Sequence, residues 1–412
     1  MRTVFKYELH LIKTPHLRNL RQKQSLMGIQ MEIEGLDVFK KLDFRMCMQC
    51  GECTGSCPVS PKSKLNPRRL MLEIAYTVAP VKYVTMYPPV SIHEKSEVWD
   101  CTTCRTCSYL CPRDVNPMDV LIGLRGLLLE EGRVPSTLGA ALEGVYKYGN
   151  PWGLSRSKRS DWAKDLKVKY VSKGESAELL YFVGCEASYD SRAQEVARAL
   201  VKNLGKLGID FSILGNEETC CGNEVYSLGE RGLFEELKEK NLGLFEQYGV
   251  KRIVTTSPHC FHAFKNRYEK NLDVQHYTLF FADLVDKGRV KFSGKVEKTI
   301  TYQDPCFLGK HNNVYDEPRK IIESIPGVKF SELRRSRVRS VCCEGGGGRM
   351  WHDIPGKRLA ETRVEEALDV GAEILAVACP FCLLTFEDAI KTTGNEDKIK
   401  VMDIMELVAE AL

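Results

Sequence analysis

Two cysteine runs near the N-terminus constrain this chain more than any other feature. Each run has the spacing C-x2-C-x2-C-x3-C and is followed directly by proline. The first run is Cys47, Cys50, Cys53 and Cys57, and the second is Cys101, Cys104, Cys107 and Cys111. Three closely spaced thiolates bind one 4Fe-4S cubane, and the fourth cysteine of each run binds the other cubane. The spacing therefore predicts two cubanes, with Cys111 completing the first set and Cys57 completing the second.

Structural zinc and free core cysteines are the alternative interpretations of these eight residues, but zinc sites rarely use a doubled four-cysteine run. Helix signals follow both runs. Asn66-Pro67 and Asn116-Pro117 are typical helix starts, and Gly132 suits a helix end. We therefore predict a mainly helical two-cluster ferredoxin domain over 40–132, an N-terminal extension over 1–39 and a linker or surface strap over 133–176.

The second half of the chain contains an internal repeat with an offset of 121 to 122 residues. The first copy contains Cys185, Cys220, Cys221 and Cys260, and the second contains Cys306, Cys342, Cys343, Cys379 and Cys382. Ser257 stands where the second copy has Cys379. We place the first repeat at 177–293 and the second at 294–412.

Each repeat alternates strand-like and helix-like segments. The segments expected as strands are 179–183, 252–256, 298–302 and 373–377, and the amphipathic helical segments are 194–206, 232–248 and 356–370. Such alternation predicts α/β units with a mainly parallel sheet. The cysteines follow strands, at the edge where α/β sheets usually place their sites. The whole chain is therefore expected to be an α+β multidomain protein.

Five cysteines in the second repeat exceed the four ligands of a zinc site or a regular cubane. A larger or irregular iron-sulfur core would use all five. A glycine run, 345–348, follows the vicinal cysteine pair of this repeat. Phosphate binding by these glycines is disfavoured because the P-loop lysine and its serine or threonine are absent. We therefore predict that the glycines let the backbone approach a bulky cluster.

Composition agrees with a reduced, folded protein and excludes several classes. Cysteine accounts for 17 of 412 residues, below the ~8–10% of disulfide-stapled scaffolds. The formal charge of +4 is too small to indicate a basic surface of the kind that binds nucleic acid. Six Lys or Arg against one Glu in residues 1–30 suggest a solvated arm, or a contact with an acidic partner or an anionic membrane surface. The best apolar stretch, 120–129, contains Arg125, so we expect a cytoplasmic protein that reaches a membrane only through a partner.

From about residue 40 onward, the doubled cysteine run and the two repeats resemble the heterodisulfide reductase D-type subunit and its relatives. Those relatives include the iron-sulfur subunit of anaerobic glycerol-3-phosphate dehydrogenase and the iron-sulfur subunits paired with lactate dehydrogenases or electron-transfer flavoproteins. The resemblance implies two tandem cysteine-rich (CCG) repeats. It also implies a noncubane 4Fe-4S cluster that attacks the disulfide joining coenzyme M and coenzyme B. Carried over by position, the five second-repeat cysteines would hold that cluster and form the catalytic site.

Two positions depart from the family pattern. Ser257 replaces a ligand, so the first repeat is expected to hold a cubane, a zinc ion or nothing. Glu344 stands where the family often has glycine. His259 and His262 flank Cys260 and offer replacement ligands, although we favour surface histidines or histidines that support a ligand. The basic run Arg334, Arg335, Arg337 and Arg339 is interpreted as a solvated face, with docking of an acidic partner or anionic substrate as the alternative.

We therefore expect an iron-sulfur oxidoreductase subunit in disulfide/thiol redox chemistry of anaerobic metabolism. Its two cubanes would pass electrons to or from the noncubane cluster of the second repeat. The expected partners are a flavoprotein, a membrane cytochrome b subunit, or both, in a hetero-oligomeric complex. The alternative is a pure electron relay between a flavoprotein, of the lactate dehydrogenase or electron-transfer flavoprotein type, and a membrane cytochrome b or quinone.

Overall fold

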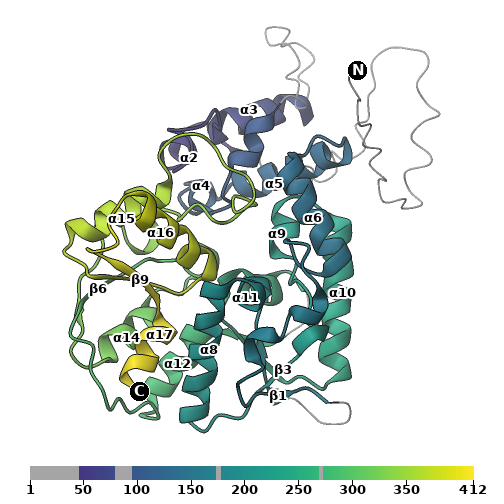
Figure 1. The fold of residues 1–412 in the computed structure, drawn as a ribbon. Coiled ribbons are helices and arrows are strands. Elements are labelled where there is room, and N and C mark those ends of the chain that lie inside the picture. The colour runs from purple at the N-terminus through teal and green to yellow at the C-terminus, as the bar shows by residue number, and fades with distance from the viewer. Residues whose placement is uncertain (1–45, 79–94, 173–177, 269–271) are drawn as a thin grey trace, which may run out of the picture. The chain divides into compact units, whose positions relative to one another are not determined.

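The computed structural model of the protein describes residues 46–78, 95–172, 178–268 and 272–412, so the expected N-terminal extension lies outside these ranges. The first described region is helical (Figure 1). Its elements are α2 (Glu52–Gly55), α3 (Pro67–Val78), the 3-10 helix η4 (Ser96–Asp100), α4 (Thr106–Tyr109) and α5 (Pro117–Glu130). This agrees with the expected helical domain around the two cysteine runs.

Both Asn-Pro signals mark the helix starts correctly. The Asn66 side chain accepts a hydrogen bond from Arg69 N at 3.0 Å and so caps α3. Asn116 stands at the cap position of α5 without bonding its backbone, and its side chain instead contacts Ser108 and Asp119. Gly132 follows α5 with φ of 73°, the left-handed conformation typical of a helix end.

Each repeat contains one parallel sheet. The first sheet has the order β1-β3-β2-β4-β5 and the second β7-β6-β8-β9, and every pairing is parallel. The strands are β1 (Lys169–Tyr170), β2 (Leu179–Phe182), β3 (Ser212–Ile213), β4 (Arg252–Thr255), β5 (Asp273–His276), β6 (Thr299–Tyr302), β7 (Lys329–Phe330), β8 (Ile374–Val377) and β9 (Lys400–Asp403). Without β1 the two orders are equivalent, which confirms the duplication and its α/β class.

Helices connect the strands of both sheets. In the first repeat they are α7 (Cys185–Tyr189), α8 (Ser191–Lys206), α9 (Asn223–Ser227), α10 (Arg231–Gln247), α11 (Pro258–Asn266) and α12 (Tyr277–Asp286). In the second they are α13 (Gly309–Asn312), α14 (Asp316–Ser324), α15 (Leu359–Asp369), α16 (Pro380–Thr392) and α17 (Ile404–Ala411). The long helices α8, α10 and α15 begin and end close to the amphipathic segments expected from the sequence.

The two repeats face each other in a reciprocal way. Helix α8 of the first packs on α17 of the second, and α12 of the first packs on α14 of the second. One continuous apolar core includes residues of both sheets, such as Tyr181 and Tyr302. At the centre, Tyr277 Oη donates a hydrogen bond to Asp403 Oδ1 at 2.8 Å. The repeats are therefore halves of one packed unit, as in a two-fold interface.

The segment 133–176 is not a plain linker. It contains α6 (Ser136–Tyr148), and β1 pairs with β3 to extend the first sheet. Asn150, Arg159 and Trp162 within it are buried. Trp162 is thus a packing anchor, and the segment belongs to the fold of the first repeat because its buried groups bond residues of that repeat.

The dicluster region is held against both repeats by buried polar contacts. The Arg125 guanidinium, fully buried on α5, donates to Val98 O and Cys101 O within its own domain, at 3.0 and 2.7 Å. The same group donates to Ser227 O and Gly347 O, at 2.8 and 3.2 Å, one in each repeat. Among the described residues, no helix combines the length and apolarity that a bilayer crossing requires.

Candidate metal centres

The structure brings the eight N-terminal cysteines into two sets that mix the two runs. One hollow is lined by Cys47, Cys50, Cys53 and Cys111, and another by Cys57, Cys101, Cys104 and Cys107. The fourth cysteine of each run therefore lies with the first three of the other, which is the grouping that exchanged ligands require. That these side chains bind clusters stays a prediction.

Both runs adopt the same local backbone. Gln49 and Thr103, each two residues after the first cysteine of a run, have φ of 58° and 50°. Gly51 and Arg105, each directly after the second cysteine, have φ of 89° and 64°. This repeated left-handed geometry curls each loop around its cysteines. It also directs the backbone N–H of Thr103 to Cys101 Sγ at 3.3 Å.

The donor set fits an iron-sulfur cluster. All 17 cysteines are free thiols, and soft thiolates are the ligands that such clusters use. Burial raises the pKa of Cys101 to about 12. Such a thiol ionises at neutral pH only when a cation binds it, and bound iron would supply that charge.

In the first repeat the four cysteines contact one another in series, from Cys185 through Cys220 and Cys221 to Cys260. They line one wall of a cavity that encloses about 620 Å³, part of it open to solvent. Trp152, Trp351 and Phe381 line the same cavity. Among the described residues no three Cys, His, Asp or Glu side chains are placed as the ligands of one ion. A cubane or zinc here thus stays a proposal.

Ser257 also lines this cavity, and its hydroxyl has a structural task. Its Oγ accepts a hydrogen bond from Cys260 N at 3.4 Å and caps the N-terminus of α11. The equivalent Cys379 offers the start of α16 only a weak sulfur acceptor. Helix capping therefore accounts for serine at this position.

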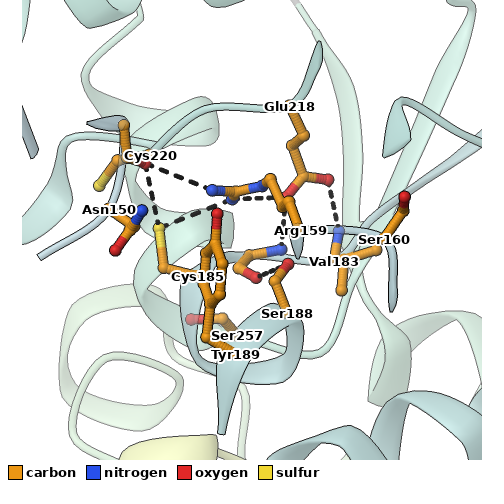
Figure 2. A network of polar contacts seen from close by, with 12 residues as sticks. Asn150, Arg159, Ser160, Val183, Cys185, Ser188, Tyr189, Glu218, Cys220 and Ser257 are labelled. Atoms are coloured by element: carbon orange, nitrogen blue, oxygen red, sulfur yellow. Dashed lines mark hydrogen bonds and ion pairs between the residues drawn. The ribbon is translucent and has the colours of Figure 1, made fainter. Parts of the chain in front are cut away.

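A buried ion pair supports Cys185 (Figure 2). Arg159 donates to Glu218 Oε1 at 2.8 Å and to Cys185 Sγ at 3.6 Å, and Glu218 also accepts from Val183 N and Gly184 N at 2.9 Å. Burial alone would lower the pKa of Arg159, but Cys185 and Glu218 raise it. The guanidinium is thus a fixed positive charge beside Cys185. The sequence reasoning missed it because Arg159 lies in the expected linker and no motif marks Glu218.

Glu186, next to Cys185, is a second residue that the sequence reasoning missed. It is buried, it lines the cavity, and neither carboxyl oxygen has a hydrogen-bond partner. Burial and the neighbouring Cys185 raise the pKa of Glu186 well above its usual value. An unpartnered buried carboxyl group is costly, so Glu186 adds to the cavity wall a polar group that the surrounding protein does not satisfy.

In the second repeat all five cysteines are buried and also form a contact series. Its order is Cys306, Cys342, Cys343, Cys382 and Cys379, with 3.2 Å between Cys382 Sγ and Cys343 Sγ. Hydrogen bonds from Cys342 and Cys382 lower the pKa of Cys343 to about 6. Five thiol groups thus converge, as the expected ligand set for a noncubane cluster requires; the ligation itself stays a prediction.

Glu344 occupies a left-handed conformation with φ of 79°, like the equivalent Gly222 at 77°. In both, the backbone N–H donates to the sulfur two residues earlier, Cys342 at 3.3 Å and Cys220 at 3.4 Å. This geometry explains why glycine suits the position. Ion pairs of the Glu344 carboxylate with Lys62 at 2.6 Å and Arg349 at 2.8 Å offset the backbone strain.

The glycine run 345–348 packs against the loop of the second cysteine run, and its approach to a cluster stays a prediction. A Cβ atom at Gly347 would lie 2.5 Å from Cys101 O, and one at Gly346 would lie 3.0 Å from Thr102 O. A Cβ atom at Gly348 would meet the Leu228 and Leu138 side chains at 2.7 and 2.9 Å. The glycines therefore let the dicluster loop approach the second repeat, and the close neighbour is the protein's own backbone.

Neither histidine beside Cys260 lies at the surface. His259 and His262 are both buried, so the surface alternative is wrong, while a role in supporting a ligand stays a prediction. Burial alone would lower the pKa of His259, but hydrogen bonds to Cys379 and Glu224 raise it to about 10. His262 instead meets Asn266 through Nδ1 at 3.0 Å. His259 thus lies against the second repeat, with its ring 4.2 Å from that of Phe307 and 4.5 Å from that of Phe381.

The basic run 334–339 is an exposed face, as expected for a solvated segment. Arg335 pairs with Glu366, and Arg337 pairs with Asp316 at 2.6 Å. Both pairs join exposed arginines to carboxylates of the same repeat, so they compensate part of the charge that an acidic partner would meet.

Family models match the same three regions. A 4Fe-4S dicluster domain matches residues 43–115, and a cysteine-rich domain, CCG, matches 179–265 and again 300–387. This combination defines a class of iron-sulfur oxidoreductase subunits. Within that class the chain belongs to the family of the heterodisulfide reductase D-type subunit.

Three relatives illustrate the family's range. The D-type subunit of dihydromethanophenazine:CoB–CoM heterodisulfide reductase from Methanosarcina barkeri is 33% identical, over 93% of this chain and 97% of that protein. The probable iron-sulfur-binding oxidoreductase FadF of Bacillus subtilis is 35% identical, over 92% of this chain and 61% of its own length. The EtfAB:quinone oxidoreductase of Syntrophomonas wolfei is 32% identical, over 90% of this chain and 58% of that protein. The chain thus spans about three fifths of the length of each of the last two proteins.

Proposed function

We propose that this chain is the electron-transferring subunit of a heterodisulfide reductase-like enzyme that acts in disulfide/thiol redox chemistry. Two cubanes would be held by Cys47, Cys50, Cys53 and Cys111, and by Cys57, Cys101, Cys104 and Cys107. A noncubane cluster would be held by Cys306, Cys342, Cys343, Cys379 and Cys382. Bound clusters would supply the one-electron redox chemistry.

The observation that carries this proposal is the contact between the dicluster domain and the second repeat. Cys104 packs with Cys306, Phe307 and Cys342 in one buried cluster. The second dicluster set therefore lies beside the five-cysteine set with no solvent layer between them. The five second-repeat cysteines and Cys104 are buried, so water is excluded from the contact between the two sets.

The other dicluster set lies at the surface and offers a docking point for an electron partner. Cys50 is exposed, and Met46 and Met48, which flank Cys47, are 45% and 62% exposed. Arg68 and Arg113 are exposed beside the same hollow. Methionine adapts to different partners and arginine is enriched at interfaces. A flavoprotein, a membrane cytochrome b subunit, or both would bind this face in a hetero-oligomeric complex.

The substrate end of the proposed electron-transfer route is the cavity between the repeats that Trp152, Trp351 and Phe381 line. First-repeat cysteines form one wall, and Phe381, which lies between Cys379 and Cys382 in the sequence, belongs to the opposite repeat. The glycine run does not open the second repeat to substrate, because it packs against the dicluster loop. A disulfide in this cavity would meet the first-repeat cysteines, whereas the five second-repeat cysteines, which ligand number favours as the catalytic set, do not line it.

A pure electron relay is the second candidate function. One relative is named as an EtfAB:quinone oxidoreductase. Ser257 is used for helix capping, so the cavity wall has one thiol fewer than a second noncubane site requires. Under this alternative, the chain would connect a flavoprotein to a membrane cytochrome b or quinone.

The deciding experiment compares oxidants on the anaerobically purified protein with its partners. Clusters reduced by dithionite should be reoxidised by an organic disulfide, with release of two thiols per disulfide. The Cys379→Ser variant should keep both cubane signals in electron paramagnetic resonance but lose disulfide turnover. Unimpaired turnover in that variant, or reoxidation by a quinone analogue alone, would favour the relay.

A further inference from the structure

The loop of the second cysteine run is bonded to the second repeat in both directions. His311, in α13, donates a hydrogen bond from Nε2 to Thr103 O at 2.9 Å. Nε2 is the donor because a carbonyl oxygen can only accept. In the opposite direction, Arg105 Nη1 donates to Lys310 O at 3.1 Å and to His311 O at 3.4 Å. These contacts, which join residues 103 and 105 to residues 310 and 311, form a clasp between the dicluster domain and the second repeat.

The clasp holds the place where two cysteine sets meet. Cys104 lies between the two clasp residues of its loop and packs with Cys306, Phe307 and Cys342 in one buried cluster. On the other side, the His311 ring stacks on the Phe307 ring, with a centroid distance of 4.1 Å and an angle of 12° between the ring planes. His311 N also donates a hydrogen bond to Cys306 O at 3.1 Å. Cys104 and Cys306 are therefore both held by residues of the clasp.

The first repeat uses the equivalent position differently. The offset of 121 residues that relates Cys185 to Cys306 places Asp190 where the second repeat has His311. The Asp190 carboxylate accepts hydrogen bonds from the first backbone N–H groups of α8, at 2.9 Å, and so caps that helix. His311 instead bonds a different domain. The clasp is thus a feature of the second repeat, which is the repeat with five cysteines.

We propose that His311 and Arg105 are positioning residues that fix the separation between the second dicluster set and the five-cysteine set, and thereby the rate of electron transfer between the groups held there. This inference rests on the proposed function of both sets. Each transfer moves one electron, which the dicluster group loses and the second-repeat group gains. The rate of such a transfer falls steeply as two redox groups move apart, and polar contacts that cross a domain interface limit relative domain motion.

The test measures the magnetic interaction between the two groups by electron paramagnetic resonance. It uses the holoprotein with its partners, in a redox state in which both groups are paramagnetic. In His311→Leu, which removes the donor and the stacked ring, we expect the spin–spin splitting to decrease. Reoxidation of the second dicluster group by an organic disulfide should slow about tenfold, the scale expected when positioned groups move by a fraction of an ångström. His311→Gln keeps an N–H donor and should recover part of both effects.

A second clasp variant and a matched control accompany this measurement. Arg105→Met removes the other half of the clasp at a half-buried side chain, so a folding defect in His311→Leu does not decide the result. His276→Leu is the control, because His276 is also buried and its Nε2 bonds a backbone carbonyl, Thr256 O at 3.1 Å, within the first repeat. This variant should lose comparable stability and change neither the splitting nor the rate.

Unchanged splitting and rate in both clasp variants, with both signals intact, would overturn the positioning role and leave the proposed function standing. A matching decrease in His276→Leu would trace the effect to lost stability and would likewise overturn it. Loss of the second dicluster signal itself in the clasp variants would assign the clasp to cluster assembly instead. Absence of any second-repeat signal in the wild-type protein would refute the proposed function and this inference together.

Discussion

At the residue scale, Ser257 and Cys379 show how one position serves two tasks. Each precedes a Pro at the start of a helix, after the equivalent strands β4 and β8. The serine hydroxyl bonds the backbone of α11, whereas the cysteine thiol faces Cys382 and His259. The repeats thus differ in whether this position holds a hydroxyl that caps a helix or a thiol that the proposed cluster would use.

The Ser257→Cys variant tests that choice. It adds a fifth thiol at the cavity wall and should raise the iron content of the first repeat, with a new paramagnetic signal after reduction. It should also lower the free energy of unfolding by about 1 kcal/mol, because the cap is lost.

Ser257→Ala is the matched control, since it removes the cap without adding a thiol. It should show the same loss of stability and no extra iron. A noncubane signal from the first repeat of the unmodified protein would contradict the inequality of the repeats.

At the element scale, the two cysteine runs form interlocked loops. Cys57 lies with Cys101, Cys104 and Cys107, away from its neighbours in sequence. The Cys57→Ser variant should therefore perturb the cluster of the second run, because a hard oxygen ligand replaces a thiolate there. Paramagnetic resonance of the reduced protein measures which signal changes. Cys111→Ser is the matched control and should alter the other signal; damage confined to the nearer cluster in each variant would refute the exchange.

The glycine run is an element-scale contact between the dicluster loop and the second repeat. Gly347 has φ of 67°, and a Cβ atom would lie 2.5 Å from Cys101 O. Gly347→Ala should therefore reduce the free energy of unfolding by the cost of backbone strain, about 1 to 2 kcal/mol, plus the cost of the clash.

A substitution at Gly371 measures the cost of backbone strain without the cost of a clash. Its φ is 71°, and no atom lies within 4 Å of its ideal Cβ position. Gly371→Ala should show the strain alone in denaturant unfolding. Equal losses in the two variants would mean that the dicluster loop does not need this close approach.

At the scale of the whole molecule, Arg125 connects the dicluster domain to both repeats through backbone carbonyls. Arg125→Met would leave these buried acceptors without a donor, so we expect a loss of about 3 to 5 kcal/mol. Hydrogen exchange should become faster at both 101–103 and 345–348.

Arg133→Met, at the half-exposed end of the same region, is the control and should change stability by no more than about 0.5 kcal/mol. Unchanged exchange at the glycine run in Arg125→Met would show that the domains stay docked without this residue. Arg125→Lys keeps the charge but lacks the planar fork, so it should restore only part of the stability.

Local spacing in the sequence was sufficient to identify the two cysteine runs, the duplication and the strands β2, β4, β6 and β8. Cysteine spacing reflects the reach of short loops, and apolar periodicity reflects which face of an element is buried. For the same reason Pro67 and Pro117 mark helix starts correctly. The family, and the expected set for each cluster, followed from these local patterns.

Contacts between distant segments depend on which surfaces meet, and no local pattern encodes that. The sequence places Arg159 in a linker, predicts a cluster beside the glycine run, and leaves His259 either at the surface or in support of a ligand. Packing instead brings Arg159 to Cys185, Gly347 to Cys101 and His259 to Cys379. Each pair joins residues far apart in the chain, and the burial of apolar faces between domains holds them together. The spacing of the cysteines was thus enough to predict the sets in which they meet, and the packing of the domains decided the surroundings of each set.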